Sequence, residues 1–520
     1  MRELAVLIAP TLLVAIGIIG RIDRSGRTRT LAAAVRTASA VSLALAIWAC
    51  WELAHHGEMH GSLLTWRGMG VSVWLDSLSV SLFLLVSGIG AAVLKYSETY
   101  LDGDPRKGRF MADLSFTLAA VMTLVLSGNL LQLVVAWIAT SLGLHRLLLF
   151  YRDRPAAVSA ARKKFVVARL GDLCLATGAI LLASTCHSGD LRLVLDHVHG
   201  LTRPGAQVEI AAIALVLAAA LKSAQFPAHG WLPDIVDTPT PVSALLHAGI
   251  INGGGFLALR FADVLTAAPG SLMLLAGIGG LTAVYGSLVL MTQTSIKAAL
   301  AWSTIAQMGL MLLECGIGAF ALALVHLIAH SVYKAHGFLS SGNAVRTVAH
   351  RHPVAPRAGR ASRAFGLVIA LVAYIALRPC LEVVLAEPLI SWTLGLVVVL
   401  GLGMLLAQGA PDLLPGWNLA REGLLAMAAM GAYIGLHAAA HALLMNTLPP
   451  APIPSPVEWV VLFAVLIAFA VIVFMQIIPE PFQSRAWYRT AYVHLAQGLY
   501  VDAFLSRFWR RLRVQTEVSL

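Results

Sequence analysis

Apolar runs of roughly 17 to 25 residues, the length of a helix that crosses a bilayer, recur along almost the whole 520-residue chain. A chain inside lipid must satisfy every backbone polar group internally, which restricts it to helices or a closed barrel. About fifteen runs predict an all-α polytopic membrane protein with about 13 to 15 transmembrane helices. We place them near residues 4–20, 31–53, 71–94, 113–127, 129–150, 165–184, 208–226, 240–262, 270–292, 298–313, 318–345, 366–386, 389–407, 424–445 and 457–478.

The basic residues lie in alternate loops, as the positive-inside rule requires. This pattern accounts for the net charge of +11 without a nucleic-acid partner. It predicts an outside amino terminus, a cytoplasmic carboxyl terminus and a bacterial inner-membrane location. The loops on one side carry Arg21, Arg24, Arg27, Arg29, Arg106, Lys107, Arg109, Arg152, Arg154, Arg162, Lys163, Lys164, Arg346, Arg351, Arg357, Arg360 and Arg363, and those near 54–70, 185–206, 263–269 and 446–456 carry few basic residues.

The stretch from Leu221 to Gly249, LKSAQFPAHGWLPDIVDTPTPVSALLHAG, places ionisable side chains among these apolar runs. It holds Lys222, His229 and His247, and four prolines interrupt it. Ionisable residues at membrane depth are expensive and mark ion paths, and irregular backbone is tolerated there only where protein or water covers it. The stretch predicts an ion-conducting core, most simply for protons. The alternative for Lys222 is an amine that reaches the membrane surface.

A second group of titratable residues recurs every four positions in ALALVHLIAHSVYKAHG. His326, His330 and Lys334 therefore share one helix face over about 12 Å. Histidine titrates near neutral pH, so this column suits a proton relay. Asp172 and Lys297 lie near the starts of other runs, where each is equally well explained as an interfacial charge.

The segment from Arg485 to Arg513 alternates basic and aromatic residues. We expect it to lie on the membrane lipid surface or to dock a partner. The docking candidates are Arg485, Trp487, Tyr488, Arg507 and Arg510. The five cysteines form no CxxC or Cys-His pattern of a zinc site, so we expect neither a metal nor a cofactor in this chain.

Residues 70 to 345 resemble the antiporter-like subunits of respiratory complex I and of multisubunit sodium/proton antiporters. The resemblance rests on YSETYLDGDPRKGRF, FVVARLGD, PAHGWLPD with PTPVSALLHAG, SIKAALAWSTIAQMG and HLIAHSVYKAHGFLSSG. It implies inverted repeats with broken helices and proton movement along a central polar axis. It also implies that Lys222 is the central lysine, that Asp172 lies near it, and that His247 joins the histidine column as a relay.

The chain departs from that family at two positions. Trp137-Ile138 stands where the family has Trp-Glu, and no lysine follows Lys334. With SLGLHRLLLFYRDRP after the missing glutamate, the chain resembles most the membrane subunit of the DAB-type inorganic-carbon accumulation complexes. In that family a large cytoplasmic zinc protein, DabA-like and similar to carbonic anhydrase, accompanies the membrane subunit.

The resemblance implies a transporter subunit, not an enzyme, whose cation flow drives carbon dioxide hydration by the zinc partner. The alternative is a proton-translocating subunit of a respiratory NADH dehydrogenase or a sodium/proton antiporter, and a third reading is a mere anchor for the partner. We divide the chain into amino-terminal helices (1–70), a proton-conducting core (71–345), carboxyl-terminal helices (346–480) and a cytoplasmic amphipathic tail (481–520).

Overall fold

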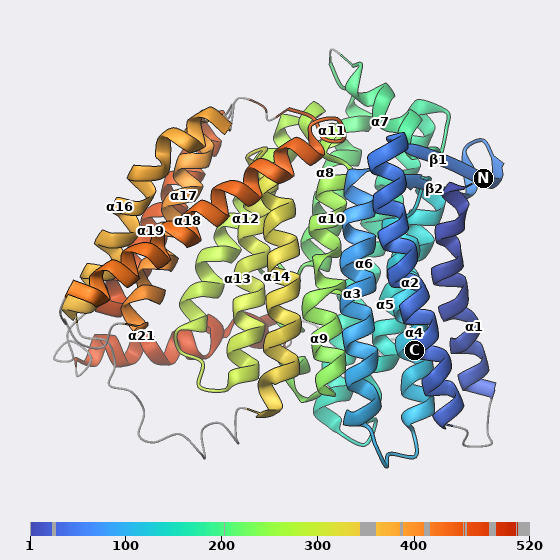
Figure 1. The fold of residues 1–520 in the computed structure, drawn as a ribbon, viewed down its shortest axis with the longest axis horizontal. Helices are drawn as coiled ribbons and strands as arrows, with labels where there is room; N and C mark the ends of the chain where they lie inside the picture. The colour runs from blue at the N-terminus through green and yellow to red at the C-terminus, as the bar shows by residue number, and fades with distance from the viewer. Residues whose placement is uncertain are drawn as a thin grey trace.

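The computed structural model describes residues 2–22, 28–201, 203–343, 360–384, 388–409, 416–450, 452, 455–477, 485–505 and 507. Long helices stand side by side through the described part of the chain (Figure 1). The first group comprises α1 (Ile8–Ile22), α2 (Thr28–His56), α3 (Ser77–Tyr100), α4 (Lys107–Val125), α5 (Leu130–Leu148), α6 (Pro155–Cys186), α8 (Ala206–Lys222), α9 (Thr240–Ala248), α10 (Gly253–Arg260), α12 (Pro269–Leu290), α13 (Ile296–Gly316) and α14 (Phe320–Ser340). The second comprises α16 (Arg360–Val384), α17 (Pro388–Gly409), α18 (Gly416–Leu444) and α19 (Pro456–Ile477).

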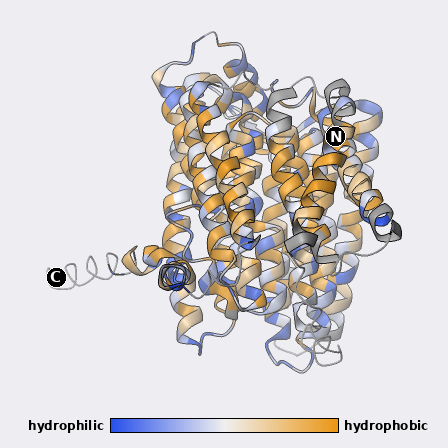
Figure 2. Cartoon of the chain, turned by 90° about the vertical axis from the view of Figure 1, so that its left-hand side faces the viewer, coloured by the Kyte–Doolittle hydropathy of each residue, from blue (hydrophilic) through white to orange (hydrophobic). Residues whose placement is uncertain are grey.

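Within the described residues, eleven helical segments are long and apolar enough to cross a membrane. Two shorter apolar helical stretches, Ala364–Leu377 and Thr393–Leu406, accompany them. Apolar residues cover the long helices, while hydrophilic ones gather near their ends (Figure 2). The chain is therefore a helical multi-pass membrane protein, as its apolar runs predict.

A two-stranded antiparallel hairpin interrupts the helical pattern at one end of the bundle. Strands β1 (Met59–Trp66) and β2 (Met69–Leu75) pair across Arg67 and Gly68, both of which have positive φ angles (51° and 74°). Such angles match the tight turns that join twisted strands. We predicted a loop at 54–70 and a helix from residue 71, and both predictions are wrong because the hairpin occupies residues 59–75. Helix α3 begins only after Asp76, whose carboxylate accepts the Ser79 amide at 2.7 Å.

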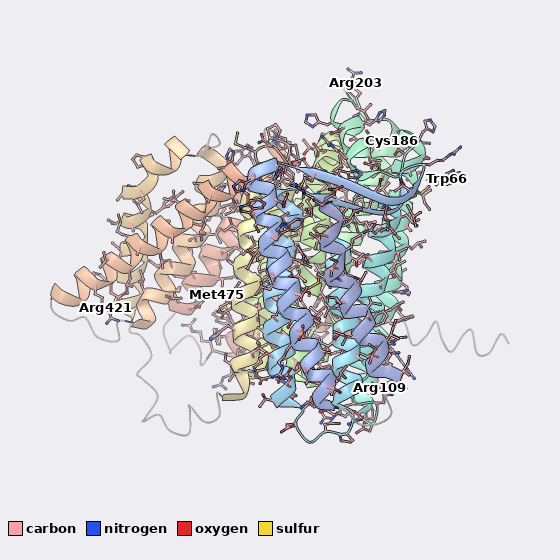
Figure 3. All side chains as sticks on the ribbon, turned by 45° about the vertical axis from the view of Figure 1, so that its right-hand side comes forward. Trp66, Arg109, Cys186, Arg203, Arg421 and Met475 are labelled. Carbon is pink, nitrogen blue, oxygen red and sulfur yellow. The ribbon has the colours of Figure 1, made fainter. Side chains whose placement is uncertain are left out.

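We call this end of the bundle the hairpin end and the opposite end the basic-loop end. Figure 3 labels Trp66, Cys186 and Arg203 at the hairpin end and Arg109 at the basic-loop end. Short elements α7 (Leu191–His199) and α11 (Ala262–Ala267) also lie at the hairpin end (Figure 1).

Helix α6 begins ten residues before the apolar run that predicted it, with Pro155 in its first turn. Proline is favoured there because the first helical amides have no partner within the helix. Arg162, Lys163 and Lys164 therefore belong to a helix and not to the loop in which the sequence analysis placed them. Lys164 is buried, with 5% of its surface exposed.

The segment after α8 contains two interruptions that leave backbone groups near the middle of the bundle. Helix α8 ends at Lys222, and residues 223 to 239 form turns and the short helix η2 (Pro233–Asp237) before α9 begins. A single turn of 3₁₀-helix, η3 (Ile250–Asn252), then separates α9 from α10. The first interruption lies where the proline-rich stretch predicts a broken helix, and the second directly follows the end of that stretch at Gly249.

The carboxyl-terminal helices pack on one side of the core. Helix α19 contacts α12, and α18 contacts α14. Helix α21 (Ala486–Ala496) and the 3₁₀ turn η5 (Gly498–Tyr500) follow them, and α21 lies crosswise to the long helices in the lower half of Figure 1. Gly498 and Asp502 then contact Tyr285 and Lys163 of the core.

Candidate functional site

Lys222 is held by side chains of α5 at the point where α8 ends. Its Nζ donates to the Thr140 hydroxyl at 2.9 Å and lies 4.3 Å from the centre of the Trp137 ring. Trp137 and Thr140 are both buried at 1% exposure. An ammonium group over an aromatic face gains a cation–π interaction. Because residue 138 is Ile, these neutral groups stand where the family resemblance led us to look for a carboxylate.

Helix α6 adds charged groups to this site. Asp172 is buried and pairs with Arg169 at 2.6 Å, and both interact electrostatically with Lys222. Lys164 lies two turns earlier and donates to the Ser141 carbonyl and hydroxyl oxygens at 2.8 and 2.9 Å. We call Lys164, Asp172 and Lys222 with their α5 partners the lysine cluster.

Two small cavities meet at Lys222. One, of about 20 Å³, is lined by Ser141, Lys164 and Lys222 on its polar side. The other, of about 30 Å³, is lined by Lys222 and Thr140 and reaches Asn252 and Ser331. Each has room for a water molecule, which needs about 10 to 15 Å³ of such space. Lys222 therefore stands between two sites that a proton-carrying water can occupy.

The second cavity reaches α14 at Ser331, beside the histidine column. Asn252 in η3 donates to the Ser331 hydroxyl at 2.6 Å, and Ser331 follows His330. His330 is buried, and neither of its ring nitrogens has a hydrogen-bond partner in the described part of the chain. It interacts electrostatically with His247, His326 and Lys334. We call these four residues the histidine cluster.

Each other member of the histidine cluster has a polar partner. His247 Nδ1 lies 3.0 Å from the Thr304 hydroxyl. Lys334 is 1% exposed; its amine donates to the Leu300 carbonyl at 3.0 Å and contacts the Ser303 hydroxyl. These bonds tie α14 and α9 to α13.

Glu314 on α13 supplies a buried carboxylate at the other end of the column. Both of its oxygens lie 3.0 Å from His326 Nδ1, and Gln307 Oε1 lies 2.7 Å from Nε2. A carboxylate on one ring nitrogen and an amide oxygen on the other suit a doubly protonated imidazole, in which both nitrogens donate. His326 is therefore arranged to hold a proton.

The structure brings six of the eight predicted path residues into these two clusters: Lys222 and Asp172 in the first, and His247, His326, His330 and Lys334 in the second. His229 and Lys297 lie elsewhere. His229 Nε2 lies 3.1 Å from the Tyr285 hydroxyl, which donates to the Gly498 carbonyl at 2.8 Å. Lys297 reaches the Val236 carbonyl at 3.5 Å.

Sequence reasoning missed Lys164, Thr140 and Glu314 as site residues. Lys164, Ala168 and Asp172 follow an i, i+4, i+8 spacing, which would have placed both charges on one face of a longer helix. Glu314 directly follows an expected run and was not considered. Thr140 gives no signal, because a threonine in an apolar helix usually bonds its own backbone.

The candidate docking residues lie on or near α21. Arg485 precedes its first turn, Trp487 is 52% exposed, and the Tyr488 ring packs against Trp487 with centroids 5.9 Å apart. Arg507 is exposed, and Arg510 lies outside the described residues. Among the described side chains no group of three or more His, Cys, Asp or Glu residues is placed to hold a metal ion.

The chain matches two sequence families. Residues 127–361 match the family described as NADH:quinone oxidoreductase/Mrp antiporter, TM. Residues 68–111 match that described as NADH-Ubiquinone oxidoreductase (complex I), chain 5 N-terminus. In the solved Mrp complex from Dietzia sp., one chain superposes with a TM-score of 0.70 at 24% identity, covering 99% of this chain and 60% of that one. The fold is therefore that of an antiporter-like subunit.

Relatives with curated names extend the match. The protein described as probable inorganic carbon transporter subunit DabB2 of Halothiobacillus neapolitanus is 37% identical over 470 residues, which is 86% of this chain and 83% of the relative. The DabB protein of Hydrogenovibrio crunogenus, described in the same terms, is 43% identical over 312 residues, covering 57% and 60%. NAD(P)H-quinone oxidoreductase chain 5 of Synechocystis is 35% identical over 305 residues, covering 57% and 45%. The chain thus belongs to the family of antiporter-like membrane subunits that includes the DabB proteins.

Proposed function

We propose that this chain is the proton-conducting membrane subunit of an energy-coupled inorganic carbon transporter. In this proposal protons move through the lysine and histidine clusters, and their flow drives carbon dioxide hydration by a cytoplasmic DabA-like zinc protein. The basic-loop end then faces the cytoplasm of a bacterial inner membrane, following the positive-inside rule. The similarity to proteins named as inorganic carbon transporter subunits supports the substrate.

The observation that carries the proposal is the continuity of polar groups on both sides of Lys222. One cavity joins its amine to Asn252 and to Ser331, the residue that follows His330 on α14, and another joins it to Lys164. Buried ionisable groups in a membrane bundle are expensive, so they usually mark a transport path. A mere anchor for a partner would not need them.

A respiratory or antiporter role is the second candidate, supported by the match over residues 127–361 and by the complete column of His326, His330 and Lys334. The neutral partner of Lys222 argues against this role, because the amine bonds the Thr140 hydroxyl and Ile138 stands where the family resemblance has a glutamate. The two candidates differ in what co-purifies with the chain. One large soluble zinc protein supports the carbon transporter, and a set of other membrane subunits supports the alternative.

The direct test replaces Lys222 by Ala in cells that depend on the complex for inorganic carbon uptake. The amine is the junction of the two cavities, so we expect at least a tenfold loss of uptake per complex, in line with the 10² to 10⁴ that a positioned proton-transfer group contributes. Co-purification of the partner should remain normal. Lys95→Ala, which removes an exposed lysine on α3, is the matched control. Unchanged uptake in Lys222→Ala would refute conduction through this site.

The partner is proposed to dock at the basic-loop end, on the surface formed by Arg485, Trp487, Tyr488 and Arg507. Trp487 presents a large half-exposed aromatic surface, and aromatic and arginine side chains are enriched where partners bind. Arg510 extends this surface in sequence. Binding there would place the partner beside the end of the proposed route.

A further inference from the structure

The buried amine of Lys164 is a feature of the lysine cluster whose role the family resemblance does not assign. It lies inside the bundle on α6 and donates only to oxygen atoms of Ser141 in the described part of the chain. Burial of an ammonium group without an opposite charge is expensive. A neutral amine bears no such penalty, so this environment tolerates the loss of the proton.

Lys164 lies on the basic-loop side of Lys222. Gly171 of α6 faces Leu221 of α8, since a Cβ on that glycine would lie 3.5 Å from the Leu221 Cβ. Lys164 is seven residues nearer the start of α6, which begins at the basic-loop end. At 1.5 Å per residue it lies about 10 Å closer to that end than the level of Leu221.

Lys164 and Lys222 line one cavity of about 20 Å³, whose other walls are mostly apolar. The carboxylate near them, Asp172, is already paired with Arg169 at 2.6 Å. Two like charges in one poorly solvated site disfavour each other, so the site favours one charged and one neutral amine. A water in the cavity can then pass a proton from the Lys222 ammonium to the lone pair of Lys164.

His145 continues this direction on α5. It follows Ser141 by four residues, so both side chains lie on the face of α5 that meets α6. Its ring packs against Phe165 with centroids 4.9 Å apart, and it interacts electrostatically with Lys164. Its Nδ1 is buried without a hydrogen-bond partner among the described atoms. An imidazole with a free ring nitrogen can accept a proton.

From this geometry we infer that Lys164 and His145 form the inner arm of the route, which carries protons from Lys222 toward the basic-loop end. Lys164 takes a proton from Lys222 through the shared cavity, and its ammonium then gives that proton to the His145 imidazole. The inference rests on the proposed function and deepens it. It assigns an exit on the side where the partner is proposed to dock.

The test measures inorganic carbon uptake per assembled complex for Lys164→Met, Lys164→Arg and Lys222→Ala. Methionine fills the site without an amine, whereas arginine keeps the charge and the donors to Ser141 but does not deprotonate in proteins. Arg162→Met is the control, because it removes an exposed positive charge from the same helix. Proton entry into liposomes containing the purified complex gives a second readout.

We expect both Lys164 variants to lose at least about tenfold in uptake and proton entry, with Arg162→Met close to the parent. Parental uptake in Lys164→Arg would overturn the inference, since it would mean that the amine only bonds α5 to α6. Parental uptake in Lys164→Met would overturn it as well. If Lys164→Met yields little complex, Lys164→Arg decides alone. A normal Lys222→Ala would instead refute the proposed function, so the two failures are distinguishable.

Discussion

Substitution of Asp76 should expose how strongly one buried ion pair stabilises the hairpin end of the core. Its carboxylate binds the Arg260 guanidinium at 2.5 and 3.1 Å, and both side chains are almost fully buried. The guanidinium also lies 4.6 Å from the Trp74 ring. Asp76→Asn retains a side-chain oxygen to cap α3 but leaves the arginine charge buried without its partner. Breaking a buried pair in this way costs about 3 to 5 kcal/mol.

Asp76→Ala also removes the cap of α3, worth about 1 kcal/mol. It should therefore be the less stable of the two variants. The double variant Asp76→Asn with Arg260→Met removes both charges and should regain most of the loss, because no charge is then buried without its partner. Equilibrium unfolding in mixed mild-detergent and dodecyl sulfate micelles measures these differences. A loss below about 1 kcal/mol for Asp76→Asn, or a double variant no better than the single one, would refute the reasoning.

Two further predictions concern the two ends of the molecule. At the hairpin end, His60 Nε2 lies 3.1 Å from the Asp190 carboxylate, and this pairing raises the pKa of His60. Burial opposes a lower pKa for Asp190, but the pairing with His60 and the backbone amides of Leu193 and Arg192 outweigh it and lower the pKa. The pair should stabilise the folded state fully between about pH 4 and 6.5. That stabilisation should fall as the pH rises through the raised His60 pKa, and also as the pH falls through the lowered Asp190 pKa. Thermal unfolding midpoints from pH 3 to 8 check this, and His60→Ala should flatten the profile. At the basic-loop end, Asp502 pairs with Lys163 at 2.7 Å but is partly exposed, so Asp502→Asn should change the free energy of unfolding by less than about 1 kcal/mol. Because this pair restrains the segment after residue 484, the same variant should be cleaved faster there by a protease. Unchanged cleavage would contradict that restraint.

The long helices were predictable because their apolar runs are continuous, whereas the hairpin and the start of α6 were not. Strand β1 has a single buried position, which gives no periodic signal, and β2 ends in four consecutive buried residues, so MGVSVWL merges into the apolar run of α3. The first turns of α6 carry Arg162, Lys163 and Lys164 close together, which resembles a charged loop. A helix whose first turns are polar gives no apolar period at its start.

The candidate site was predictable where one ionisable residue interrupts an apolar run. Lys222 and the column of His326, His330 and Lys334 stand out for that reason, and the helical spacing of the column was sufficient to place it on one face. The partners of these groups were not predictable, because Thr140 and Glu314 acquire their roles from neighbouring helices. His229 shares a motif with Lys222, yet it contacts Tyr285, which bonds Gly498, and not the lysine cluster.

The Lys222 amine bonds a hydroxyl and not a carboxylate. This difference favours release of its proton over exchange of ions across the membrane. An ammonium bound to a carboxylate gains both opposite charge and a strong hydrogen bond, and a departing proton must break both. Lys222 is bound to Thr140 by one hydrogen bond to a neutral oxygen. On one side of it lies a second amine, Lys164, and on the other the route ends at Glu314, whose carboxylate holds His326. Glu314, whose carboxylate binds the path histidine His326, thus lies toward the hairpin end. The amines of Lys222 and Lys164 bond uncharged oxygen atoms and lie toward the basic-loop end. In the proposed function, protons are collected at the hairpin end and released toward the basic-loop end, the direction that the proposed cytoplasmic partner requires.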